Sequence, residues 1–168
     1  YGISPRSRMR EIFEYCRCYA AEFGKCSASL FMHGAPGLGK THLSLAIANV
    51  VVEKGFEVIY GSAQNLLSSL EREKFGGGSG EREKELLDCD LLIIDDLGSE
   101  FSTQFTVACI YNIIITRIYL GKPVIISTNL TGEELEAKYT QRITSRIIGS
   151  YVSLLFIGKD IRQLKKFY

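Results

Sequence analysis

The segment 34–41 reads GAPGLGKT and matches the pattern GxxxxGK[ST] in full. Gly37 and Gly39 let the backbone curl so that its N–H groups point inward, where they can hold phosphate oxygens. Lys40 can then reach the β- and γ-phosphates of ATP, and the Thr41 hydroxyl can ligate Mg²⁺. A chance glycine-rich turn is the alternative, and the strand and helix expected on either side disfavour it. We expect the nucleotide to contact Gly34, Ala35, Pro36, Gly37, Leu38, Gly39, Lys40, Thr41 and His42.

Two adjacent acids, Asp95 and Asp96, end the apolar segment LLII. Carboxylates at the carboxyl tip of a buried strand belong at a crevice, because an apolar strand does not bury charge without a partner. We expect Asp95 to help hold Mg²⁺ and Asp96 to act as a base or to orient the attacking water. The alternative for Asp96 is an ordinary acid that caps the next turn. Many proteins with these motifs carry a glutamate in place of Asp96, and aspartate is one methylene shorter. We expect this difference to affect the rate of hydrolysis rather than the binding of the nucleotide.

Asn129 follows a second apolar segment, VIIST. In a parallel sheet the tip of this strand would lie beside that of the Asp95 strand. Asn129 is therefore a candidate to hydrogen-bond the γ-phosphate or the attacking water. A turn-forming Asn is the alternative, since Thr-Gly follows shortly after it.

Strands that alternate with helices must position these groups. Five apolar segments are typical of strands: 29–33, 57–60, 91–95, 124–127 and 152–156. Helical spacing of apolar residues and end signals favour helices over 5–23, 40–53, 64–74, 81–87, 103–120, 133–138 and 141–148. This alternation predicts an α/β fold with a parallel sheet covered on both faces.

The 168 residues suit a single domain, with a leading helix in 1–25 and the P-loop core in 28–168. The first residue is not Met, which suggests a piece of a longer chain. No apolar run approaches the roughly 18 residues of a membrane span, so no membrane association is expected.

The five cysteines follow neither a zinc-binding nor a paired pattern, which favours reduced thiols and a cytoplasmic location. Positive charge gathers after residue 137, where it can meet phosphates or form ordinary surface.

Five segments in order, GAPGLGKT, LLIIDDLGSE, VIISTNLT, QRITSRIIGS and FIGKDIRQLK, resemble the AAA+ domain of the DnaC/DnaI-type bacterial helicase loaders. The IstB-type transposition helper ATPases belong to the same family. The resemblance runs from about residue 28 to the end. It implies a P-loop NTPase three-layer sandwich with sheet order 5-1-4-3-2, ATP and Mg²⁺ as cofactors, and Asn129 as the sensor 1 residue. The chain ends too early for a full C-terminal helical lid.

The same resemblance assigns roles to two arginines. It implies that Arg146 is an arginine finger presented to the ATP of a neighbouring subunit, and that Arg162 is a sensor-2-like contact. Arg142 and Arg117 are rival candidates for the finger. A surface salt bridge is the alternative role for each arginine.

The function that we predict from these features is Mg²⁺-dependent ATP hydrolysis in a DNA replication protein that loads the replicative hexameric helicase onto DNA. Self-association through ATP-bridged interfaces is expected, with the helicase bound by a region outside this segment. Single-stranded DNA is a further candidate partner, and Tyr139 and Tyr151 are aromatic candidates to stack on its bases. The alternatives are a transposition helper, an ATP-gated binding module with little turnover, and a P-loop kinase, which usually needs an arginine-rich lid.

Overall fold

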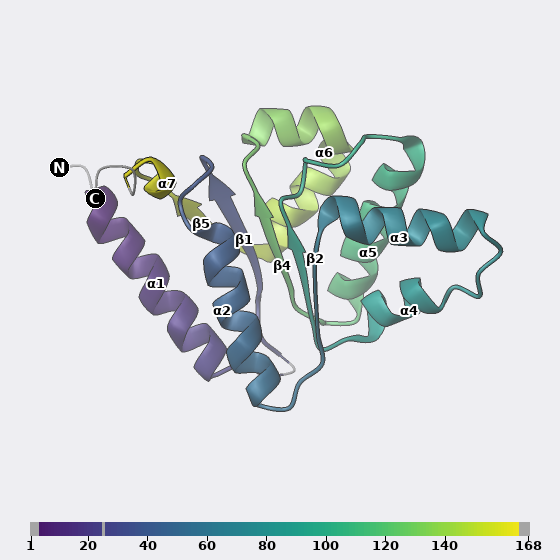
Figure 1. Ribbon diagram of the computed structural model, residues 1–168, viewed down its shortest axis with the longest axis horizontal. Helices are drawn as coiled ribbons and strands as arrows, with labels where there is room; N and C mark the ends of the chain where they lie inside the picture. Colours follow the sequence, from purple (N-terminus) through teal and green to yellow (C-terminus); the bar gives the residue numbers. More distant parts are fainter. Residues whose placement is uncertain (1–3, 25, 165–168) are drawn as a thin grey trace.

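A single parallel sheet of five strands forms the centre of the molecule (Figure 1). The computed structural model describes residues 4–24 and 26–164. The strands are β1 (Ser29–Gly34), β2 (Val58–Ser62), β3 (Leu91–Asp95), β4 (Val124–Thr128) and β5 (Tyr151–Phe156). Their order across the sheet is β2-β3-β4-β1-β5, which is the predicted order 5-1-4-3-2 read from the other edge. The predicted sheet is therefore confirmed.

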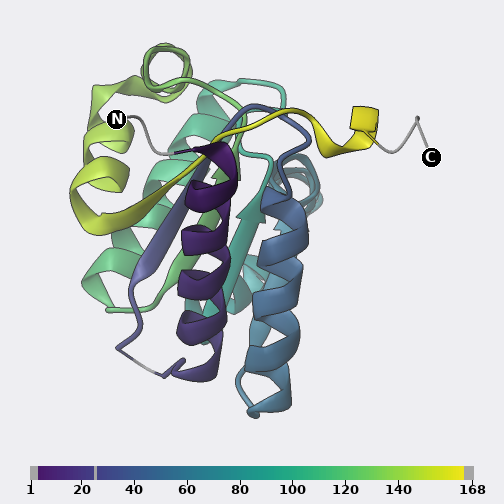
Figure 2. The same ribbon diagram turned by 90° about the vertical axis from the view of Figure 1, so that its left-hand side faces the viewer.

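Helices cover both faces of this sheet. They are α1 (Pro5–Ala21), α2 (Lys40–Glu53), α3 (Ala63–Phe75), α4 (Glu81–Asp88), α5 (Gln104–Tyr119), α6 (Gly132–Ser150) and α7 (Ile161–Leu164). Figure 2 shows α1 and α2 side by side over one face, and α3 to α6 cover the other. Within the described residues, none of the helices combines the length and apolar character needed to cross a membrane.

The strands divide their side chains between the two faces because successive residues of a strand point in opposite directions. In β3, Leu91 and Ile93 pack with the core beneath α1 and α2, whereas Leu92 and Ile94 pack with the core beneath α3 to α6. All five residues of β3 are buried. The strand is therefore apolar along its length and polar only at its carboxyl tip, which confirms the predicted three-layer sandwich.

Helix α6 contains a break where two separate helices were predicted. Its start is fixed by a capping box in which Thr131 and Glu134 bind each other's backbone N–H groups. Thr140 has φ 75° and ψ 153°, which no helix accommodates, and it separates the predicted segments 133–138 and 141–148. The short helix α7 was not predicted.

Arg117 is fully buried, with 0% of its surface exposed, so its proposed role as an arginine finger is wrong. Its guanidinium group lies in the interior below α4 and donates hydrogen bonds to five backbone carbonyls. These belong to Leu86, Leu87, Cys89, Asp90 and Pro123. Because the last carbonyls of a helix have no partner within the helix, Arg117 caps α4 and joins it to the segments that precede β3 and β4.

The two tyrosines considered for stacking on single-stranded DNA are also buried. Tyr139 lies in the core between α6 and the sheet, and Tyr151 lies at the start of β5. Neither ring is accessible to a nucleic acid base, so this prediction is wrong. Exposed aromatic rings are instead found at Phe75 and Phe101, which are 72% and 83% exposed.

Replacement of Arg117 by alanine should lower the free energy of unfolding by about 3 kcal/mol or more, because several buried carbonyls lose their donor. The exposed Arg146 offers a matched control: Arg146→Ala should change the free energy by less than about 0.5 kcal/mol. Urea unfolding followed by circular dichroism measures both values. Equal stability of the two variants would contradict the capping role of Arg117.

Candidate functional site

The loop between β1 and α2 has the backbone conformation that its glycines predict. Gly37 has φ 75°, and a Cβ added there would lie 1.9 Å from the carboxylate of Asp160. Gly34 has φ 133°, and a Cβ there would lie 2.2 Å from the carbonyl oxygen of Phe156. Larger residues would therefore strain the backbone and collide with the end of β5 or with the segment that follows it. Gly39, with φ 91°, turns the loop into the first residue of α2.

Lys40 directs its ammonium group back into this loop. Its Nζ donates to the carbonyl oxygens of Gly34 and Ala35, at 2.7 Å each. Desolvation by burial lowers the pKa of Lys40, while the nearby carboxylates of Asp96 and Asp95 oppose this effect. The loop thus holds a single positive charge at the place where the phosphates of a nucleotide are expected.

Asp95, at the tip of β3, accepts hydrogen bonds from three hydroxyl groups. The Thr41 hydroxyl lies 3.0 Å from both carboxylate oxygens, and the Tyr60 hydroxyl lies 2.9 Å from Oδ2. Ser127 donates to Oδ1. The predicted pair of metal ligands, Thr41 and Asp95, is therefore in direct contact. The atoms that meet at this point are three hydroxyl oxygens and the two carboxylate oxygens of Asp95.

Tyr60 and Ser127 are members of this cluster that sequence reasoning missed. Tyr60 lies on the edge strand β2, two residues before Ser62, which pairs with Asp95 in the sheet. Burial, followed by the hydrogen bond to Asp95, raises the pKa of Tyr60 to about 12, so its hydroxyl remains a donor near neutral pH. Ser127 and Thr128 are polar residues at the end of an apolar strand. This pattern is the one feature of the sequence that could have indicated that β4 supplies a hydroxyl group to the site.

Asp96 and Asn129 also meet, as expected from adjacent strand tips. The Asn129 amide donates to Oδ1 of Asp96 at 3.0 Å. Asp96 has φ 55°, in the left-handed region that few residues other than glycine adopt. Its own N–H donates to the Ser127 hydroxyl at 2.8 Å. These contacts hold the carboxylate at the mouth of the site in a conformation typical of functional positions.

A pocket of about 660 Å³ joins these groups, a size that suits a small ligand. It is lined by Pro36, Gly37, Leu38, Gly39, Lys40, Thr41, His42, Leu45, Asp95, Asp96, Asn129, Ile161 and Arg162. Gly34 and Ala35 lie at the start of the same loop, where they bind Lys40. The structure therefore brings together the predicted residues of the loop, the two strand tips and Arg162. Arg146 and its rival candidates Arg142 and Arg117 lie elsewhere.

Arg162 reaches the pocket from the segment that follows β5. Its guanidinium group is bound by the carboxylate of Asp160 at 2.9 and 3.1 Å. The N–H of Ile161 donates to the carbonyl oxygen of Gly37 at 2.9 Å. This segment therefore packs directly against the glycine-rich loop.

Arg146 and Arg142 lie on one exposed face of α6, four residues apart. Within residues 4–24 and 26–164, neither guanidinium group forms an ion pair with a carboxylate. Neither lines the pocket of its own chain. Both arginines are therefore available to a second molecule, and the geometry leaves either of them as the possible finger.

Comparison with known proteins identifies the family of this chain. Residues 16–151 match the model of a family described as IstB-like ATP binding protein. The chain belongs to this family. A relative named "Replicative helicase loader DnaC", from Buchnera aphidicola subsp. Acyrthosiphon pisum (strain APS), is 28% identical over 162 residues. The alignment covers 94% of this chain and 65% of the relative, so the chain spans somewhat less than two thirds of that protein.

Solved structures place the fold of this IstB-like domain within the AAA+ class. The crystal structure of the DnaC helicase loader matches with a TM-score of 0.80 at 25% identity, over 88% of this chain and 89% of that one. AMPPCP-bound DnaA from Aquifex aeolicus matches with a TM-score of 0.79 at 24% identity, over 99% of this chain and 54% of that one. The predicted family and fold are confirmed.

Lys40→Ala should weaken ATP binding by about 10- to 100-fold, because it removes the one charged donor inside the loop. Lys84→Ala, which removes an exposed lysine on α4, is the matched control and should bind as the wild type does. Titration with a fluorescent ATP analogue measures both affinities. A folded Lys40→Ala variant with unchanged affinity would overturn the assignment of the loop.

Proposed function

We propose that the pocket binds ATP together with Mg²⁺ and hydrolyses it. The observation that carries this proposal is the double contact at the strand tips, where Asp95 meets Thr41 and Asp96 meets Asn129. Phosphoryl transfer to water needs one group to hold the metal and another to orient the water, and the two pairs match these needs. Hydroxyl and carboxylate oxygens are the ligands that Mg²⁺ prefers.

The loop and the start of α2 hold the phosphates. Backbone N–H groups at a helix start point toward an anion there, and the helix dipole favours negative charge. Lys40 exchanges the carbonyls of Gly34 and Ala35 for oxygens of the β- and γ-phosphates. Thr41 and Asp95 hold Mg²⁺, which neutralises part of the phosphate charge.

Asp96 orients the attacking water and accepts its proton, while Asn129 holds Asp96 or the γ-phosphate. The contact between the two side chains fixes the carboxylate before the nucleotide binds. Since the aspartate side chain is short, the water must approach closely or through a second water. A binding module with little turnover remains the alternative, and it predicts no change in turnover when Asp96 is replaced.

Arg146 serves the ATP of a neighbouring subunit. Its exposure on α6 and its distance from the pocket lining of its own chain support this role. A guanidinium group keeps its charge at neutral pH and can bind two phosphate oxygens at once, which suits the charge that develops on the γ-phosphate. Hydrolysis therefore requires self-association with ATP at the interface between subunits.

The domain acts in loading a replicative hexameric helicase onto DNA. The relative named a replicative helicase loader, which aligns along 94% of this chain, supports this function more directly than transposition. An IstB-like transposition helper is the second candidate, because the matching family is described as IstB-like ATP binding protein. Binding of single-stranded DNA fits the exposed rings of Phe75 and Phe101.

Arg146→Ala should bind ATP almost normally but hydrolyse it poorly, because its own pocket is intact. When it is mixed with Asp96→Asn, some activity should return, since a mixed interface pairs an intact pocket with an intact arginine. Steady-state phosphate release under conditions of self-association measures this. A mixture that assembles but shows no recovery excludes Arg146 as the finger and makes Arg142→Ala the next variant for the same assay.

The proposed loading function predicts that the full-length protein deposits helicase hexamers on single-stranded DNA coated with a binding protein. Loading should fall to background with Lys40→Ala, because nucleotide binding drives assembly. The number of hexamers retained on immobilised DNA measures the effect. Stimulation of a transposase without helicase loading would favour the transposition helper instead.

A further inference from the structure

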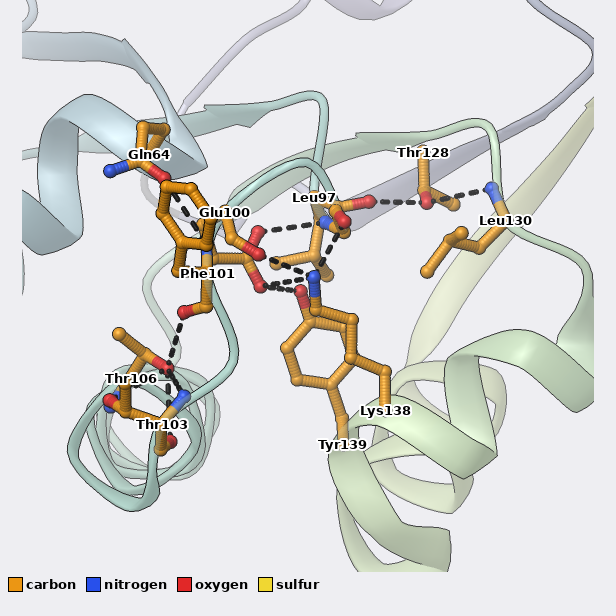
Figure 3. Close-up of polar contacts among 11 residues, drawn as sticks. Gln64, Leu97, Glu100, Phe101, Thr103, Thr106, Thr128, Leu130, Lys138 and Tyr139 are labelled. Carbon is orange, nitrogen blue, oxygen red and sulfur yellow. Dashed lines mark hydrogen bonds and ion pairs between the residues drawn. The ribbon is translucent and has the colours of Figure 1, made fainter.

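Glu100 is a buried carboxylate that none of the proposed steps uses. Its side chain is only 1% exposed and lies five residues after Asp95 in the sequence. Figure 3 shows its carboxylate directed toward Lys138 and Tyr139 of α6. Oε2 accepts the N–H of Gly98 at 2.9 Å, and Oε1 accepts the hydroxyl of Tyr139. Burial, and next the hydrogen bond to Glu100, raises the pKa of Tyr139, so its hydroxyl remains a donor. A carboxylate buried to this degree is tolerated only where donors surround it.

Lys138 completes this cluster and binds the same loop. Its Nζ lies 3.5 Å from Oε1 of Glu100 and donates to the carbonyl oxygens of Gly98 and Glu100, at 2.6 Å each. Lys138 and Tyr139 are consecutive residues of α6 (Figure 3). The cluster therefore ties the loop that follows Asp96 to one point on α6.

The other end of this loop is fixed to the nucleotide pocket. Leu97 donates its N–H to the carbonyl oxygen of Ser127 at 2.8 Å and accepts the Thr128 hydroxyl at 2.6 Å. Asp96 binds the Ser127 hydroxyl. Only three residues separate Asp96 from Glu100, and the backbone at both ends is held. A displacement of Asp96 must therefore move Glu100 or break these hydrogen bonds.

The cluster lies immediately before the break in α6. Thr140, the residue after Tyr139, has φ 75°, which is costly for a β-branched side chain. The helical segment beyond it carries Arg142 and Arg146. A break in a helix lets the two halves reorient. The second half packs on the core through Ile143 and Ile147, and its orientation on that core also depends on where residues 138 and 139 are held.

We propose that Glu100 is a positioning residue, which links the nucleotide pocket of its own subunit to the arginine-bearing half of α6. The proposal rests on the ATPase function proposed above. A nucleotide that contacts Asp96 and Asn129 fixes the position of the loop that follows Asp96. The hydrogen bonds of Glu100 with Lys138 and Tyr139 then determine where α6 places the arginine that faces the next subunit. Apolar packing would stabilise the fold as well as a buried ion pair does, but it would not fix one geometry through directional bonds.

Glu100→Gln tests the proposal, because the amide keeps the size and loses the charge. Hydrogen exchange of residues 141–150 is measured with and without Mg²⁺ and AMPPCP, alongside nucleotide affinity and turnover. We expect the nucleotide to slow exchange in the wild type but not in Glu100→Gln. Affinity should stay within about threefold while kcat falls by about 10- to 100-fold, as misplacement of a reacting group predicts. Tyr139→Phe should show the same loss of kcat and of nucleotide-dependent exchange to a smaller extent. It replaces Glu100→Gln as the test if that variant does not fold.

Tyr151→Phe is the matched control, because it also removes a buried tyrosine hydroxyl. Tyr151 begins β5 and so lies at the amino end of its strand, whereas the pocket lies at the carboxyl ends. This variant should leave affinity, kcat and exchange unchanged. A folded Glu100→Gln protein with wild-type kcat and wild-type nucleotide-dependent exchange would overturn the positioning role. The same conclusion follows if a bound nucleotide does not change hydrogen exchange of residues 141–150 in the wild type. Failure of the wild type to hydrolyse ATP while exchange still responds to nucleotide would instead contradict the proposed ATPase.

Discussion

The carboxylate of Asp95 joins four separate parts of the chain. Its hydroxyl donors come from the first turn of α2, from β2 and from β4, while Asp95 itself ends β3. Hydrogen bonds to an ionised acceptor are about twice as strong as neutral ones. This one group therefore fixes the register of the P-loop helix against three strands, and the pocket depends on that register.

Such an arrangement is possible because the carboxyl ends of the strands carry the polar groups of the pocket, whereas the rest of the sheet stabilises the fold. The strand interiors are apolar on both faces and supply the core. At the carboxyl ends, polar groups face the pocket, whereas near the amino ends of β3 and β4 the buried Arg117 satisfies backbone carbonyls without any role in the site. The same residue type thus stabilises the fold at one end, while at the other end Arg162 faces the pocket.

The fold and the centre of the site could be predicted from the sequence because their signals are local. A glycine-rich loop with Lys40, and acids at the tip of an apolar strand, each identify themselves within a few residues. Tyr60 could not be found in this way, because its contact with Asp95 depends on sheet register and on the reach of a long side chain. Glu100 was missed for a similar reason, since its partners on α6 lie almost 40 residues away.

The errors have a common physical origin. Charge or aromaticity in a sequence suggests exposure or binding, but Arg117, Tyr139 and Tyr151 are each buried. Long side chains can satisfy their polar ends inside a protein when backbone carbonyls or a carboxylate are within reach. Sequence position alone does not reveal those partners.

In the proposed ATP site, the ion pair between Arg162 and Asp160 bears on how firmly Arg162 would hold a phosphate. Because the guanidinium group already has a carboxylate partner, a phosphate gains from Arg162 only the difference between two ion pairs. Asp160 competes for the arginine again whenever a phosphate leaves, and its neighbour Ile161 is hydrogen-bonded to the loop at Gly37. In the proposed ATPase, this competition would favour release of a phosphate from Arg162 over its retention.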